Sequence, residues 1–200
     1  DDEKLIINLD YQGKNYWKKA KDYRSCFVDG GVYSNFLSST APFAIRATSY
    51  IIKPSDFNKR ERFEPTLGYY GDLYDANNNI YDLSEDPYED NQLLAKKKDA
   101  ARIIFETAAL AHHVFNKRNF QYCLSHGPLQ TPIMPFSGPE FPLLKQDVAE
   151  DLIPFFKFDK NKILDRHFIN IYLNLNKFIQ KAKFPIYGIV ERTGSTIYLR

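Results

Sequence analysis

Asp29 and His126 are the residues of this sequence whose surroundings most favour chemistry. Each follows a short apolar run and stands directly before glycine. A carboxylate at the end of a buried strand costs free energy unless a cation or hydrogen-bond donors compensate it, and the imidazole ring is a common metal ligand. The two residues therefore predict a metal site, whereas two ordinary strands ending in glycine-bearing turns explain the same pattern without one.

The offsets within the two runs predict that Asp29 and His126 share one face of a sheet. Cys26 and Cys123 stand three residues before Asp29 and His126, respectively. Side chains alternate between the two faces of a strand, so matched offsets on adjacent strands bring matched residues together. We expect two parallel neighbouring strands, with both cysteines buried and both candidate ligands at the same edge.

Glu106 is a third candidate ligand, carried by a predicted helix over residues 91–117. Apolar residues recur there at spacings of three and four, as expected for a helix that packs on a sheet: Ala101, Ile104, Ala108, Ala111 and Phe115. Glu106 lies beside this stripe and could project over the strand ends. Arg102 stands four residues earlier, so a surface ion pair is the alternative. We interpret the adjacent His112 and His113 as structural, because neighbouring helical residues point in different directions.

Composition bounds the class of protein. The 200 residues are 44% apolar and 16% aromatic, enough for one domain with its own core. No apolar run is long enough to span a membrane, and the acidic start is unlike a signal peptide, so we expect a cytoplasmic protein. Two cysteines do not suggest a disulfide framework. The net charge of +2 allows nucleic acid as a partner without requiring it.

The predicted elements give an α/β fold. After an N-terminal arm over residues 1–24, the expected order is a three-strand meander, a helix, a strand, a second helix and a strand. The predicted strands cover residues 25–29, continuing after a bend over 32–37, then 42–52, 67–74, 121–126 and 185–190. The predicted helices cover residues 91–117, a short stretch within 145–156, and 160–182 with Asp159 as its cap. A further strand begins after Ser195, and we expect the domain of residues 25–200 to continue beyond Arg200. This order is that of a ribonuclease H-like mixed sheet, in which the first strand neighbours the strand after the first helix.

Four motifs in this order resemble the NurA nuclease family. They are Phe27-Val28-Asp29-Gly30-Gly31 followed by Phe43–Ala47, the helix with Arg102 and Glu106, the strand end Leu124–Leu129, and Tyr187–Arg192. The resemblance implies a ribonuclease H-like core, manganese-dependent cleavage of DNA, a homodimer, and work beside a hexameric HerA-like ATPase that translocates DNA, in end processing or phage defence. Carried over by position, it implies that Asp29 and Glu106 bind the metal.

The sequence departs from that family at three points. His126 stands in place of an aspartate, Gly31 in place of a serine, and the family's later tyrosine and histidine would lie beyond Arg200. An imidazole nitrogen suits Mn²⁺ better than Mg²⁺ and cannot ligate once protonated. We therefore expect Mn²⁺ to be the better cofactor, Mg²⁺ to support little or no activity, and metal binding to weaken as the pH falls through the titration range of imidazole, at about 6.5.

Two alternatives remain open from the sequence. The first is a degenerate, weakly active or inactive module that binds a partner ATPase or DNA without cutting. The second is an unrelated hydrolase that uses cysteine or serine with His113 or His126. The chain has no Gly-x-Ser-x-Gly motif, and neither cysteine has an evident activating neighbour in the sequence.

Overall fold

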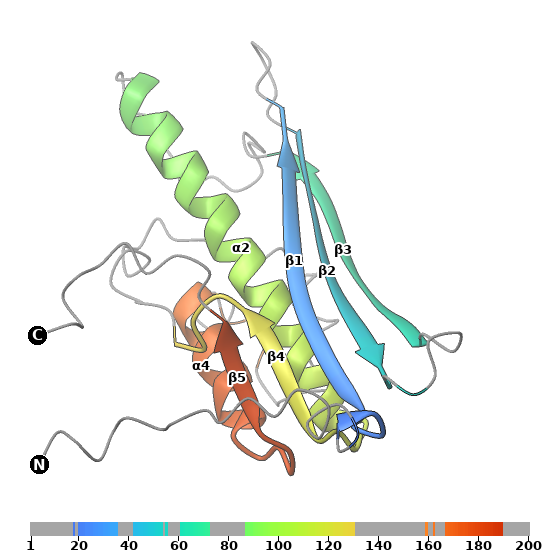
Figure 1. The fold of residues 1–200 in the computed structure, drawn as a ribbon. Helices are drawn as coiled ribbons and strands as arrows, with labels where there is room; N and C mark the ends of the chain where they lie inside the picture. Colours follow the sequence, from blue (N-terminus) through green and yellow to red (C-terminus); the bar gives the residue numbers. More distant parts are fainter. Residues whose placement is uncertain are drawn as a thin grey trace, which may run out of the picture.

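In the part of the chain that the structure describes, five strands form one mixed sheet in the spatial order β3-β2-β1-β4-β5 (Figure 1). The strands are β1 (Ser25–Ser34), β2 (Pro42–Ile52), β3 (Glu61–Asp72), β4 (Tyr122–His126) and β5 (Ile186–Ile189), and the two long helices are α2 (Pro87–Phe115) and α4 (Phe168–Ile179). The structure is a computed structural model that describes residues 18, 20–35, 42–53, 55, 61–72, 87–130, 159, 162 and 167–189.

The sheet combines a meander with two parallel strands. β1 pairs antiparallel with β2, and β2 pairs antiparallel with β3. β4 lies parallel to β1 on its other side, and β5 lies parallel to β4. The prediction of adjacent parallel strands is confirmed, because Cys26 is the register partner of Cys123 and both side chains are fully buried.

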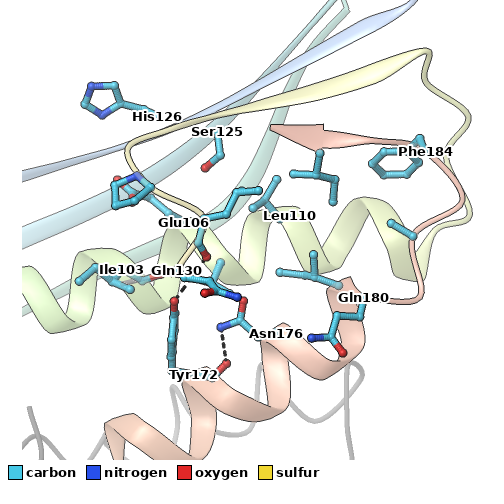
Figure 2. Close-up of a pocket in the computed structure, with 16 residues that line it drawn as sticks. Ile103, Glu106, Leu110, Ser125, His126, Gln130, Tyr172, Asn176, Gln180 and Phe184 are labelled. Atoms are coloured by element: carbon cyan, nitrogen blue, oxygen red, sulfur yellow. Dashed lines mark hydrogen bonds between the residues drawn. The ribbon is translucent and has the colours of Figure 1, made fainter. Parts of the chain in front are cut away.

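The two faces of the sheet have different environments. Alternate residues of β1 and β2 point toward the helices and are buried: Cys26, Val28, Ile45, Ala47, Ser49 and Ile51. The residues between them point to the other face, where Asp29 is exposed. Both helices lie on the same side of the sheet (Figures 1 and 2). One face therefore belongs to the core, and α2 and α4 leave the other uncovered.

Helix α2 supplies most of the cover on the core face. Small buried side chains, Ala100, Ala108, Ala109 and Ala111, allow its backbone to approach the strands closely, and Ile104 and Phe105 fill the space between them. The predicted stripe is confirmed at Ile104, Ala108 and Ala111. Phe115, in contrast, is 47% exposed at the helix end. The helix begins at Pro87, four residues before the predicted start, and ends at Phe115 rather than residue 117.

Helix α4 packs against α2 and is shorter than predicted. Phe168, Ile171 and Leu175 recur at spacings of three and four and are fully buried, as expected for a helix with one apolar face. The helix begins at Phe168 rather than at residue 160, and Asp159 is not its cap. His167 is extended, with φ −66° and ψ 140°, and its Nδ1 accepts a hydrogen bond from the Ile169 amide at 3.3 Å. The His167 side chain therefore caps the N-terminus of α4. The start predicted from the apolar periodicity was too early in the sequence.

Other boundaries differ more modestly. β1 runs to Ser34 without the predicted bend at Gly30 and Gly31, and β3 covers Glu61–Asp72 rather than residues 67–74. The short helix predicted within 145–156, the strand after Ser195 and most of the N-terminal arm lie outside the described residues. In the part of the chain that the structure describes, no helix has the length and apolar character needed to cross a membrane.

Candidate functional site

Asp29 and His126 lie side by side at the end of β4. His126 Nδ1 is 3.4 Å from Asp29 Oδ1, and the two side chains are 44% and 70% exposed, respectively. The neighbouring Gly30 amide donates a hydrogen bond to the same Asp29 oxygen at 2.8 Å. The pairing follows from the register, which places Val28 opposite Ser125 one residue earlier. The predicted meeting of these two residues is confirmed.

The turn after β4 leaves the pair accessible. Gly127 adopts φ 80°, a conformation that favours glycine, and its amide donates to the Ile189 carbonyl at 2.8 Å. The turn then packs closely on Gly188 of β5, where a Cβ would lie 2.6 Å from the Gly127 oxygen. The chain therefore bends toward β5 directly after His126, while β1 continues past the pair.

Glu106 approaches the same place from the other side of the sheet. Its side chain lies against Gly30, where a Cβ would come within 2.6 Å of Glu106 Cγ and 2.7 Å of Oε1. A Cβ at Gly31 would meet nothing within 4 Å. Gly30 is thus the glycine that the helix requires, because only a residue without a side chain lets Glu106 approach β1 so closely.

Glu106 is a buried carboxylate joined to a cation. The residue is 8% exposed, and Arg102 Nη1 lies 2.8 Å from its Oε1. Burial raises the pKa of Glu106 above its ordinary value, although the Arg102 guanidinium opposes the shift; the Asp29 carboxylate raises it further, and His126 lowers it. Glu106 therefore interacts electrostatically with both residues of the pair. It is buried, so its pairing with Arg102 is not an ordinary surface ion pair.

The three predicted ligands are not gathered into one cluster. Figure 2 shows His126 on the opposite side of β4 from Ser125 and Glu106. Among the residues that the structure describes, no three histidine, cysteine, aspartate or glutamate side chains form a group able to hold a metal ion. The structure brings together Asp29 and His126, and it places Glu106 beneath the next residue of β1, bonded to Arg102.

A cavity of about 300 Å³ opens beside Glu106 on the helix side. Its walls come from α2, α4 and the ends of β4 and β5, and His126 contributes to its rim. The polar side chains that line it include Thr107, Ser125, Gln130, Asn176 and Gln180, and the lining of Figure 2 also includes Leu110 and Phe184. Tyr172 on its wall donates a long hydrogen bond of 3.5 Å to the Leu129 carbonyl. Sequence reasoning missed this cavity, because it depends on how α4 sits against α2.

The side chains of the Asp29–His126 pair are of types that can bind a divalent cation. Asp29 offers carboxylate oxygens and His126 a ring nitrogen, a combination compatible with Mn²⁺, and both are accessible to solvent, which can complete a coordination shell. Glu106 offers a further carboxylate within electrostatic reach. Its bond to Arg102 would have to open, or be shared, before it could serve as a third ligand.

A cysteine–histidine contact lies deep in the core, apart from the Asp29–His126 pair. His113 Nε2 is 3.4 Å from Cys26 Sγ, and its ring meets Phe120 edge-to-face at 5.3 Å. A hydrogen bond from the Cys123 thiol is the main cause that lowers the pKa of Cys26 to about 6, and the His113 ring adds to it. Cys26, Cys123 and His113 are all fully buried, so a substrate cannot reach them. Their burial argues against a hydrolase that uses Cys26 or Cys123 as its nucleophile, and it agrees with the prediction that His113 is structural.

Comparison with known proteins finds similarity only among solved structures. No family profile matches the chain, and no curated protein matches its sequence. The chain is similar to the NurA nuclease from Sulfolobus solfataricus, with 17% identity and a TM-score of 0.41 over 90% of this chain and 54% of that one. It is also similar to a structure of NurA bound to dAMP and manganese, with 16% identity and a TM-score of 0.29 over 70% and 28% of the two chains.

The present chain spans about half the length of the first of these structures and less than a third of the second. At these identities and TM-scores the likeness carries no conclusion about activity. Any conclusion about the chemistry of the site therefore depends on the residues of this chain.

Proposed function

We propose that this chain is a metal-dependent nuclease of the NurA type that hydrolyses phosphodiester bonds in DNA. The observation that carries the proposal is the contact of 3.4 Å between Asp29 and His126, in register at the end of two parallel strands and open to solvent. Glu106 supports it, because a buried carboxylate with a raised pKa beside this pair is typical of a functional site.

The residues of the site divide the work in this proposal. Asp29 binds the cation with its carboxylate, and His126 binds it through a ring nitrogen. When bound, a divalent ion supplies an activated water nucleophile and compensates the negative charge on the leaving oxygen. Glu106 contributes negative charge from the helix side when it is ionised, and the Arg102 guanidinium opposes the rise in its pKa that burial causes. The Gly30 amide, which donates to Asp29 Oδ1, holds the carboxylate in its orientation.

The remaining parts of the proposal rest mainly on the resemblance of the four sequence motifs to the NurA family. We propose a ribonuclease H-like fold, which the strand order and the parallel pairing of β1 with β4 support. We further propose Mn²⁺ as the preferred cofactor, a homodimer, a HerA-like hexameric ATPase as partner, a role in DNA end processing or phage defence, and a cytoplasmic location.

A degenerate module that binds DNA or a partner ATPase without cutting is the alternative function. Two observations favour it. His126 brings no negative charge where the family has an aspartate, and Arg102 holds Glu106 at 2.8 Å, so the described residues provide no three-ligand cluster.

A cleavage assay separates the two functions. The chain is incubated with linear DNA and Mn²⁺ or Mg²⁺, beside Asp29→Ala and, as a matched control, Asp22→Ala, whose carboxylate is exposed near Ser55 and Lys53. The nuclease proposal expects Mn²⁺-dependent cleavage that is lost in Asp29→Ala and retained in Asp22→Ala. Absence of cleavage by the wild type would favour the degenerate module, whereas equal cleavage by Asp29→Ala would contradict the assignment of Asp29 to the site.

A further inference from the structure

The sheet face opposite α2 exposes large apolar side chains around the Asp29–His126 pair. Tyr33 is 73% exposed, Tyr187 54% and Ile189 42%. The solvent face of an antiparallel sheet is usually polar, so large apolar side chains exposed together on this face suggest that it binds something. This face of the sheet, opposite α2, is referred to below as the open face.

Strand register orders the open face into rows. One row crosses four strands as Tyr50, Phe27, Leu124 and Tyr187. The next row contains Thr48, Asp29, His126 and Ile189. Tyr33 lies four residues beyond Asp29 on the same strand and so points to the same face. Aromatic rings therefore stand on both sides of the pair along β1, with Phe27 before it and Tyr33 after it.

The position of the pair limits what can occupy the open face. A protein partner that covered the aromatic residues would also bury Asp29, which is 70% exposed, and His126. Burying these polar groups without new partners costs free energy and would separate them from any substrate. Arg46 supports a different occupant, since its side chain is exposed on this face opposite Gly31, and a guanidinium suits phosphate.

Building on the function proposed above, we propose that the open face binds an unpaired DNA strand, whose bases stack on Tyr187 and Tyr33 while its backbone crosses the Asp29–His126 pair. The bases of a duplex are stacked inside the helix and offer no free face to protein rings. Unpaired bases stack readily on aromatic side chains carried by a sheet. Tyr50 and Phe27 are partly buried and extend the same platform.

Fluorescence anisotropy tests the proposal without cleavage. A fluorescein-labelled single-stranded oligodeoxynucleotide, or the blunt duplex of the same sequence, is titrated with protein in EDTA. We expect the single strand to bind more tightly than the duplex, and Tyr33→Ala and Tyr187→Ala each to weaken binding roughly fivefold or more, the loss of one stacked base. Tyr187→Phe should bind like wild type, because stacking uses the ring and not the hydroxyl.

Controls separate stacking from general effects. Phe115→Ala and Leu173→Ala remove exposed apolar side chains from helices, away from the open face, and should leave affinity unchanged. Circular dichroism and light scattering report folding and oligomeric state for every variant. Unchanged affinity in Tyr33→Ala and Tyr187→Ala, or equal binding of duplex, would overturn the proposal. A shift from dimer to monomer in these variants with DNA binding intact would also overturn it, and would assign the face to a second copy.

The outcomes are distinct from those of the cleavage assay. Cleavage that depends on Asp29, with DNA affinity indifferent to Tyr33 and Tyr187, would support the nuclease and reject the open face as its binding surface. Single-strand binding that depends on the two tyrosines, without any cleavage, would support the open face and reject the nuclease.

Discussion

At the scale of single residues, Gly30 shows how the helix and the strand share space at the site. Glu106 occupies the volume that a side chain at Gly30 would need. Its neighbour Gly31 has no such contact, although the two are indistinguishable in sequence. The double glycine is evident in the sequence, but which of the two glycines contacts the helix is not, because that depends on the rotation of α2 about its axis.

Gly30→Ala should lower stability by about 1–3 kcal/mol, because the new methyl group forces Glu106 out of its position. Gly31→Ala is the matched control and should leave stability unchanged or slightly raised. Urea unfolding of both variants measures the difference. Adding Glu106→Ala to Gly30→Ala should restore part of the loss, and equal effects at the two glycines would contradict the packing described.

Glu106 should make stability depend on pH. The folded chain raises the pKa of this carboxyl above its ordinary value of 4.5, mainly through burial, so the folded state takes up a proton more readily than the unfolded state. The stabilisation is fully present below the ordinary value and is lost as pH rises through the raised folded pKa. Glu106→Gln does not titrate, so the Tm of wild type relative to this variant should fall as the pH rises above the ordinary value of 4.5. Parallel Tm curves would show that Glu106 titrates normally.

At the scale of elements, periodicity predicted which segments pair and pack but not where they end. The β1–β4 pairing and the buried stripe of α4 follow from alternation and from three–four spacing in the sequence. The start of α4 was wrong by eight residues because His167, which is not a strong capping residue in sequence rules, caps the helix with its ring nitrogen. The approach of His113 to Cys26 was also missed, since no local pattern encodes a contact between a helix and a strand 87 positions apart.

Helix α4 offers a sharp test of the core. Leu175 is fully buried, whereas Leu173 on the same helix is 41% exposed. Leu175→Ala should destabilise the chain by about 2–5 kcal/mol through lost burial and a residual cavity. Leu173→Ala should change stability by no more than about 0.5 kcal/mol. Thermal denaturation of the two variants is the measurement, and similar Tm losses would mean that α4 faces the core differently.

At the scale of the whole molecule, the sequence predicted a mixed sheet and the meeting of two site residues, and it left the third unresolved. Asp29 and His126 could be predicted to meet because matched offsets on parallel strands define a contact. Glu106 could not be placed, because its position depends on a balance between Arg102, burial and any bound cation. Its bond to Arg102 is 2.8 Å long in the structure, and a cation at the site would compete for the same carboxylate.

We expect Asp29 and His126 together to bind a divalent cation, and calorimetric titration of Mn²⁺ measures this binding. The wild type should bind Mn²⁺, Asp29→Ala should bind roughly tenfold more weakly or not at all, and Asp22→Ala should match wild type. His126→Asp should bind more tightly, because it adds a negative charge beside Asp29. Equal affinity in wild type, Asp29→Ala and His126→Asp, or no binding by any of them, would contradict the claim.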